Sequence, residues 1–343
     1  MTSKDRVNAV FANKSYDRLP LWYGGAPETT TQICDYLKVS SEEEAMRTLG
    51  IDFVTLRPQY TGKPLRNGDT IWGIQRDGVH YGQALNHPLS HAEEIRDIEN
   101  HTWPDENDWD VYITGEEQHL CRDYCVIGGM WSPFFHDVTE LMGMEKCYID
   151  MCFNPKLVEA LIERVFLFYY NITERTFQAN PGCVDLFFFG NDFGSQRGLL
   201  CSPEMWRRFF KPYLKQLVDL GHRYGAKTAL HSCGDIHEII PDLIDIGLDA
   251  LNPIQVNADN MDPAVLKKEY GRDLVFWGAI DENIILSTGR EQDVRRETRR
   301  MIDLLGADGR YIVAASHDYL LPEVPAANIC AMYDEAKQYS KVL

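Results

Sequence analysis

A histidine and a cysteine two positions apart, in the run His231-Ser232-Cys233-Gly234, offer the clearest chemistry in this sequence. Residues two apart on a strand point to the same side, so this imidazole and this thiolate could bind one metal ion together. Such ligands suit Zn²⁺, which takes a tetrahedral set of nitrogen and sulfur atoms and keeps one position open where it is catalytic. A histidine with satisfied hydrogen bonds beside a buried cysteine is the alternative interpretation.

A third metal ligand must come from another part of the chain. We predict His317, because it follows an apolar run that ends at residue 315 and would lie at the same end of the fold. Its alternative role is a hydrogen bond with Asp318 or with solvent. Cys201 is a further candidate, as is Asp281, although an aspartate after a strand often caps a helix.

Polar and aromatic side chains follow several of the predicted strands and could bind a substrate. Asp192 lies in a glycine-containing loop and is predicted to take part in catalysis together with His231 and Cys233. The same loop residues could instead cap the next segment, and some of the aromatic residues must belong to the core. The predicted substrate-binding residues are Tyr23, Asn191, Gln196, Asn252, Gln255 and Trp277.

The elements that position these residues are short apolar runs that alternate with helical stretches. Continuously apolar runs are typical of strands that are covered on both faces, as in a parallel sheet. Eight alternations predict an α/β fold, a (β/α)₈ TIM barrel that forms one domain over residues 1–343, with its active site at the carboxyl ends of the strands. A doubly wound open sheet is less favoured, because no glycine-rich phosphate turn follows an early strand. The predicted strands are 20–24, 52–57, 124–129, 184–189, 227–231, 250–252, 274–277 and 311–315.

Three long helices have recognisable ends. One opens at Pro155, and one opens at Pro203 with a kink predicted at Pro212, because proline removes a backbone donor and crowds the preceding turn. The last helix begins near Pro325.

The segment 59–123, after the second predicted strand, is too long for a simple connection and is predicted to be an insertion. Within it, Arg76-Asp77-Gly78 separates two strand-like runs, 69–75 and 79–83, which indicates a hairpin. This insertion would be either a lid over the barrel or an excursion without a functional role.

Composition excludes several classes of partner. The chain has 343 residues, with 52 acidic and 34 basic side chains, and its formal charge of −18 disfavours nucleic acids and anionic membranes. It contains neither an apolar run of membrane-spanning length nor an N-terminal signal core, so a cytoplasmic location is expected. Nine cysteines are scattered along the chain, a pattern that does not indicate a disulfide framework, and most are expected to be buried thiols.

Four segments resemble the uroporphyrinogen decarboxylase superfamily. They are residues 190–206, the run His231-Ser232-Cys233-Gly234, residues 249–255 and residues 277–281. The resemblance implies a (β/α)₈ barrel, a plausible homodimer, and one of two activities. One is the metal-free decarboxylation of uroporphyrinogen, and the other is zinc-dependent methyl transfer to or from a corrinoid protein.

Within that superfamily, the chain resembles the methyltransferase branch more closely. Residues 23–28 read Tyr-Gly-Gly-Ala-Pro-Glu and lack the arginine-rich pattern that holds the carboxylates of the decarboxylase substrate. His231 and Cys233 match the first two zinc ligands of the methyltransferases. Those enzymes often take a later cysteine as the third ligand, where this chain reads Ala-Ala-Ser-His at 314–317.

We therefore expect a methyltransferase that uses Zn²⁺, held by His231, Cys233 and His317, and that moves a methyl group between a small substrate and a separate corrinoid protein. The small substrate would be an O-, N- or S-methyl compound or a thiol, and Asp192 and Gln255 would orient it. The cobalamin would belong to the partner, because the chain lacks a cobalt-ligating Asp-x-His-x-x-Gly pattern. A uroporphyrinogen decarboxylase and a non-catalytic tetrapyrrole- or metal-binding barrel are the alternatives.

Overall fold

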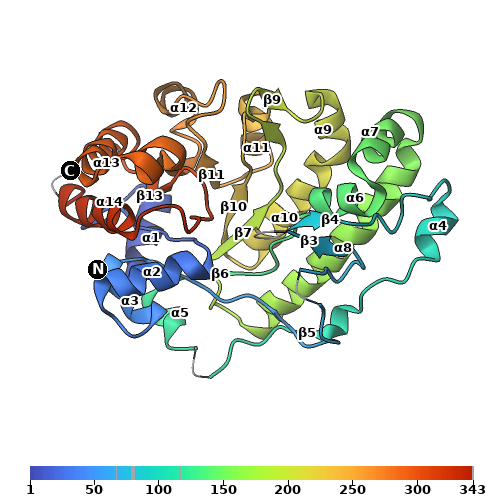
Figure 1. The fold of residues 1–343 in the computed structure, drawn as a ribbon, viewed down its shortest axis with the longest axis horizontal. Helices are drawn as coiled ribbons and strands as arrows, with labels where there is room; N and C mark the ends of the chain where they lie inside the picture. Colours follow the sequence, from blue (N-terminus) through green and yellow to red (C-terminus); the bar gives the residue numbers. More distant parts are fainter. Residues whose placement is uncertain (67, 79–81, 116, 342–343) are drawn as a thin grey trace.

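The computed structural model describes residues 1–66, 68–78, 82–115 and 117–341 of the chain. Its centre is a curled sheet in which seven strands pair in parallel in the order β1-β6-β7-β10-β11-β12-β13 (Figure 1). An α/β fold with a curled parallel sheet agrees with the predicted fold class. The strands of this sheet are β1 Phe53–Thr55, β6 Cys125–Gly128, β7 Leu186–Gly190, β10 Lys227–His231, β11 Ala250–Ile254, β12 Val275–Ile280 and β13 Tyr311–Ala315.

The first predicted strand, residues 20–24, is reduced to a single parallel bridge between Leu21 and Val313 of β13. The N–H of Asp52, next to β1, donates to the carbonyl of Leu21 at 2.9 Å, so this segment contacts both edges of the curled sheet. Two features shorten the pairing. Pro20 has no N–H, and the N–H of Leu21 donates to the carboxylate of Asp52 at 2.8 Å instead of to a strand carbonyl.

Helices surround the sheet, with α13 and α14 on one side of Figure 1 and α6, α7 and α8 on the other. Val7 and Val10 of α1 pack with the side chains that fill the inside of the curled sheet. No helix in the described ranges is long and apolar enough to cross a membrane. The helices are α1 Ser3–Phe11, α2 Pro27–Leu37, α3 Glu42–Leu49, α4 Ile95–Glu99, α5 Leu120–Asp123, α6 Phe134–Met142, α7 Met144–Phe153, α8 Pro155–Ala179, α9 Pro203–Phe209, α10 Lys211–Arg223, α11 Ile240–Asp245, α12 Pro263–Tyr270, α13 Glu291–Leu305 and α14 Ala326–Tyr339, with short turns η1 Glu106–Asp108, η2 His237–Ile239 and η3 Glu282–Leu286.

The predicted starts of the long helices are confirmed. Helix α8 begins at Pro155, α9 at Pro203, and α14 directly after Pro325. The kink predicted at Pro212 is a break between two helices, since α9 ends at Phe209 and α10 starts at Lys211.

Residues 59–123 lie between β1 and β6 and pack along the outer helices α6 and α8. Trp72 contacts the ring of Phe168 in α8 at 5.0 Å, and Leu89 N–H donates to the carbonyl of Leu141 in α6 at 2.8 Å. Short strands in this segment pair β2 (Gln59–Tyr60) with β5 (Trp109–Asp110). A lid role for this segment stays a prediction.

The predicted hairpin in this segment exists, but its register was wrong. Its strands are β3 (Arg76–Asp77) and β4 (Gln83–Ala84), so two of the three residues predicted to turn, Arg76 and Asp77, form a strand instead. Most of the run predicted as the second strand, 79–81, lies outside the described residues. Alternation of apolar residues over so short a stretch does not fix where a hairpin turns.

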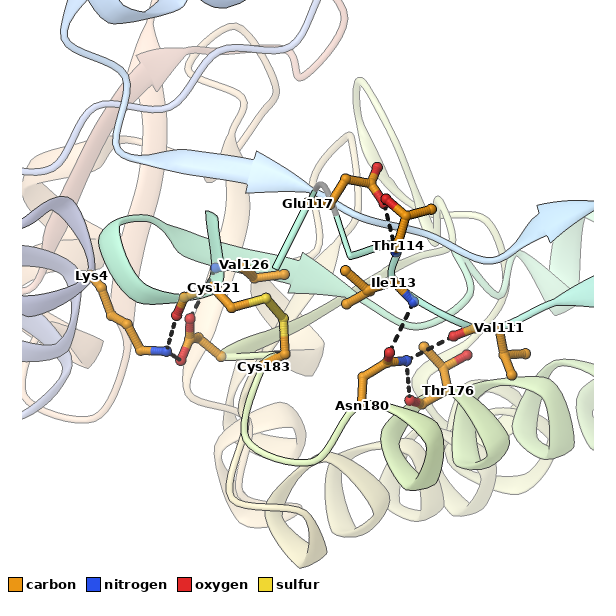
Figure 2. The surroundings of a disulfide bond; sticks show 11 residues. Lys4, Val111, Ile113, Thr114, Glu117, Cys121, Val126, Thr176, Asn180 and Cys183 are labelled. Carbon is orange, nitrogen blue, oxygen red and sulfur yellow. Dashed lines mark hydrogen bonds and ion pairs between the residues drawn. A yellow bond between two sulfur atoms is a disulfide. The ribbon is translucent and has the colours of Figure 1, made fainter. Parts of the chain in front are cut away.

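Cys121 and Cys183 form a disulfide bond, with their Cα atoms 5.0 Å apart (Figure 2). Each cysteine precedes one of the adjacent strands β6 and β7, so parallel pairing brings together two residues that are 62 positions apart. Lys4 Nζ also donates to the carbonyl of Cys121 at 2.9 Å. The expectation that most of the nine cysteines are buried thiols was therefore wrong: three of them, Cys125, Cys147 and Cys330, are buried.

Candidate functional site

The loops that follow β7 and β10 cross each other at two glycines. A Cβ on Gly234 would lie 2.3 Å from the carbonyl carbon of Gly194, and a Cβ on Gly194 would lie 2.8 Å from the backbone of Gly234. Two backbone groups bond across the crossing, since Asp235 N–H donates to the carbonyl of Ser195 at 2.8 Å. The close approach brings the end of one strand against the end of the next, where catalytic groups lie in barrel folds.

Asp192, His231 and Cys233 converge at this crossing. One ligand atom from each lies within 4.8 Å of the others. Nε2 of His231 is 3.2 Å from Oδ1 of Asp192 and 3.5 Å from Sγ of Cys233, and Cys233 N–H donates to Oδ1 of Asp192 at 2.8 Å. Carboxylate oxygen, imidazole nitrogen and thiol sulfur therefore face one small space.

The other ring nitrogen of His231 has oxygen atoms around it. Nδ1 lies 2.9 Å from Oδ1 of Asn252 and 3.3 Å from Oδ2 of Asp318. Both atoms are acceptors, so Nδ1 carries a hydrogen. Nε2 donates to the Asp192 carboxylate when the ring is charged, and offers a lone pair to a metal when the ring is neutral. The ring thus presents a ligand atom toward Asp192 and Cys233.

The three converging residues shift one another's pKa values. Burial disfavours the charged form of His231, but Asp318, Asp192 and Cys233 outweigh it and raise its pKa well above the ordinary value. Burial also works against ionisation of Asp192, yet the hydrogen bond and charge of His231 hold that carboxyl pKa well below its usual range. Burial raises the pKa of the Cys233 thiol, and His231 offsets part of the rise.

These three residues fit a zinc ion. Tetrahedral coordination with bonds of about 2.0–2.3 Å requires ligand atoms roughly 3.3–3.8 Å apart. The separations of 3.2 and 3.5 Å around Nε2 of His231 are close to that range. Three protein ligands leave the fourth position open, as in catalytic zinc sites.

Comparison with known proteins assigns the family. The sequence signature described as uroporphyrinogen decarboxylase (URO-D) matches residues 88–339, which is most of the chain. This chain belongs to the uroporphyrinogen decarboxylase family. The superfamily resemblance noted in the sequence is thereby confirmed.

The chain is similar to methyltransferases of Methanosarcina mazei in both sequence and structure. The sequence is 23% identical over 221 residues to the methylcobamide:CoM methyltransferase MtbA, a match that covers 64% of this chain and 59% of that protein. This chain therefore spans less than two thirds of that relative. A solved structure, a methyltransferase from Methanosarcina mazei, has the same fold, with a TM-score of 0.70, 17% identity and 99% of both chains covered.

In this URO-D family protein, two more of the predicted substrate-binding residues border the three converging side chains. Gln255 is buried, and its Oε1 accepts the N–H of Gly234 at 2.6 Å, which helps to hold the loop after β10. Asn191 is also buried, and both its polar atoms bond to backbone, with Oδ1 accepting from Phe135 N–H at 2.8 Å and Nδ2 donating to Ser132 at 3.1 Å.

The remaining predicted residues lie outside this set of contacts. Trp277 is buried inside the curled sheet and stacks on Phe188 at 4.7 Å. The hydroxyl of Tyr23 bonds to Thr30 at 2.9 Å, and Gln196 is exposed. His317 is not among the three converging residues, and its role as a ligand stays a prediction.

Asp281, weighed from the sequence as a ligand, acts as a cap. Its Oδ1 accepts the N–H of Ile284 at 3.1 Å and the amide of Asn257 at 2.9 Å. This is the ordinary role of an aspartate between a strand and a helix.

Other residues that were not among the predicted site residues also reach the site. Trp131 lies over His231, with ring centroids 5.4 Å apart, and the guanidinium carbon of Arg57 lies 5.5 Å from the Trp131 ring. His136 Nε2 is 3.8 Å from Oδ2 of Asp192. Their position after a predicted strand was the one sequence signal that could have placed these residues at the site, and it does not show which way a side chain points.

Proposed function

We propose that this chain is a zinc-dependent methyltransferase that moves a methyl group between a small substrate and a corrinoid carried by a separate protein. The observation that carries the proposal is the convergence of Asp192, His231 and Cys233 within 4.8 Å at the ends of two adjacent strands. Similarity to a protein named methylcobamide:CoM methyltransferase supports the reaction and the corrinoid partner.

The site assigns distinct tasks to its residues. Cys233 supplies a thiolate ligand, His231 supplies Nε2, and Asp192 supplies a carboxylate that is ionised at neutral pH because its pKa is lowered. When bound, zinc would supply Lewis acidity that activates a thiol acceptor as thiolate or polarises the oxygen of a methoxy donor. Trp131 would cover one side of the imidazole and limit access of water to it.

Methyl transfer to a thiol needs no external oxidant or reductant. The sulfur lone pair forms the new bond to the methyl carbon, while the electron pair of the cobalt–carbon bond stays on cobalt. The proton of the thiol is released to water before this step. The protein therefore has to present an ionised thiol in line with the methyl group, which is a positioning task.

The decarboxylase alternative receives no support from the segment after Leu21. Residues 23–28 contain no arginine, and Gly25 pairs with Leu320 through a backbone bridge. A substrate with many carboxylates requires several guanidinium groups at the mouth of the fold.

Metal analysis and a methyl-transfer assay test the proposal together. Purified protein reconstituted with zinc should hold about one ion per chain. His231→Ala, Cys233→Ala and Asp192→Ala should each lose the ion, while Cys152→Ser, which changes an exposed cysteine, should keep it. His317→Ala decides whether the predicted ligand takes part.

Activity is then followed with methylcobalamin and a panel of thiols that includes coenzyme M. The wild-type protein and Cys152→Ser should consume the methylated corrinoid, and the three zinc-site variants should not. Uroporphyrinogen turnover that is unaffected by chelators, in protein without zinc, would overturn the proposal in favour of the decarboxylase.

A further inference from the structure

Asp318 approaches the metal-facing imidazole from the side opposite to the metal ligands. Its Oδ2 is 3.3 Å from Nδ1 of His231, whereas Asp192 and Cys233 lie around Nε2. The side chain of Asp318 is 23% exposed and that of His231 is 7% exposed, so the pair is largely shielded from water. A carboxylate that is partly desolvated forms a stronger hydrogen bond with an N–H than an exposed one does.

The backbone around Asp318 is held in place by the segment after Leu21. Leu320 N–H donates to the carbonyl of Gly24 at 3.1 Å, and Ala26 N–H donates to the carbonyl of Leu320 at 2.9 Å. A Cβ on Gly24 would lie 2.2 Å from the carbonyl oxygen of Asp318, so glycine is required for this approach. Gly24, the last residue of the first predicted strand, thereby lets this segment pack against the backbone of Asp318.

Arg57 supplies positive charge that interacts with the Asp318 carboxylate. Burial lowers the pKa of Arg57 to about 10, and the negative charge of Asp318 works against that fall. The guanidinium also donates to the carbonyls of Gly129 and Phe188 at 3.0 Å each, which fixes it at the mouth of the fold. A fixed guanidinium therefore interacts electrostatically with Asp318, the carboxylate that approaches the imidazole.

We propose that Asp318 is the positioning residue for His231. It accepts the Nδ1 hydrogen, selects the tautomer whose lone pair lies on Nε2, and holds the ring so that this lone pair points at Asp192 and Cys233. A carboxylate behind a ligating histidine orients the ring and makes the ligand atom more basic, and its loss lowers metal affinity by about 10–100-fold. This inference rests on the proposed zinc site.

Asn252 also accepts the Nδ1 hydrogen of His231, so it limits how much zinc affinity is lost when Asp318 is changed. Its Oδ1 is 2.9 Å from Nδ1 of His231, so the ring keeps one acceptor when Asp318 is changed. Asp318→Asn retains an acceptor and loses the charge, whereas Asp318→Ala loses both. We expect zinc affinity to fall in the order wild type, Asp318→Asn, Asp318→Ala, and then the Asp318→Ala/Asn252→Ala double variant.

The experiment measures zinc dissociation constants by competition with a chromophoric chelator, at fixed pH and salt. Asp318→Ala should bind zinc about tenfold more weakly, and the double variant about a hundredfold more weakly. Asp281→Asn is the matched control, because it removes a buried carboxylate at the end of the neighbouring strand β12 that caps a helix. Its zinc affinity should stay within about threefold of the wild type.

A second readout does not depend on zinc. Because the pKa of His231 is raised, the metal-free protein is followed upward in pH until the ring is neutral. Nitrogen-15 chemical shifts of labelled His231 then report the tautomer, and Asp318→Ala should raise the share of the form protonated at Nε2. Equal zinc affinity and an unchanged tautomer in Asp318→Ala, with normal binding in the wild type, would overturn this inference alone. A wild-type protein that binds no zinc would overturn the proposed function as well.

Discussion

Replacing Gly234 by alanine tests whether the crossing of two loops builds the site. The residue has φ +85°, and its new Cβ would lie 2.3 Å from the carbonyl carbon and 2.5 Å from the carbonyl oxygen of Gly194. Those atoms are backbone and cannot rotate away, so the loops must separate by roughly 1 Å to reach ordinary contact. The hydrogen bond between Cys233 N–H and Asp192 would then lengthen from 2.8 Å.

The magnitude follows from two contributions. A left-handed backbone costs an alanine about 1 kcal/mol, and forcing extra atoms into a packed position costs about 1–3 kcal/mol. Gly234→Ala should therefore lower the free energy of unfolding by about 2–4 kcal/mol and remove zinc binding. Gly182→Ala is the matched control, because that glycine has φ +73° and open space where the Cβ would be.

Urea denaturation and zinc titration of both variants give the answer. Gly182→Ala should lose about 1 kcal/mol and bind zinc normally. If Gly234→Ala loses no more stability than Gly182→Ala and still binds zinc, then close approach of the two loops does not hold the ligands together.

Three more outcomes are expected. Asp52→Asn should lower the free energy of unfolding by about 3 kcal/mol in urea, since Arg6 and Arg18 both pair with this buried carboxylate; an unchanged midpoint would contradict it. Cys183→Ser should cost about 2–4 kcal/mol by opening the loop closed by the disulfide with Cys121, and a free thiol at Cys183 in the native protein would refute the assignment. Asp137 is buried, which raises its pKa from 3.8 to about 7. The folded wild type resists this ionisation and therefore loses stability as the pH rises between those values. The melting temperature of Asp137→Asn, relative to that of the wild type, should accordingly be higher at pH 8 than at pH 5. An equal difference at both pH values would show that Asp137 does not titrate in this way.

Strand positions were predictable where an apolar run ends sharply. Strands β10 and β13 match the predicted ranges 227–231 and 311–315 residue for residue, because turn-forming or polar residues follow runs that only a covered strand would tolerate. The run at 20–24 also looked like a strand, but Pro20 has no N–H and the N–H of Leu21 donates to the buried carboxylate of Asp52, which leaves a single bridge to β13. Apolar composition predicts that a segment is buried, but it does not predict how many backbone hydrogen bonds the segment forms with neighbouring strands.

Some contacts of the candidate site could likewise be predicted from the sequence, and others could not. His231 and Cys233 could be paired from the sequence by the strand periodicity of two. In the structure β10 ends at His231, and Cys233 lies in the first residues of the loop that follows. Asp192 could be placed in the same mouth, but its carboxylate meets their ligand atoms only because β7 and β10 are neighbours in the sheet. His317 and Asp318 both follow β13, yet it is the carboxylate of Asp318 that reaches His231, at 3.3 Å. Linear spacing does not reveal which of two consecutive side chains points at the site.

Taken alone, the sequence determined the properties that depend on near neighbours along the chain: the alternation of strands and helices, the helix starts at proline, the paired imidazole and thiol, and the family. Tertiary structure decided which distant groups meet: Asp192 with Cys233, Asp318 with the far nitrogen of His231, and Cys121 with Cys183. The physical reason is that side-chain periodicity is a local property of the backbone. Contact between distant residues depends instead on strand order and on loop crossings that glycine permits.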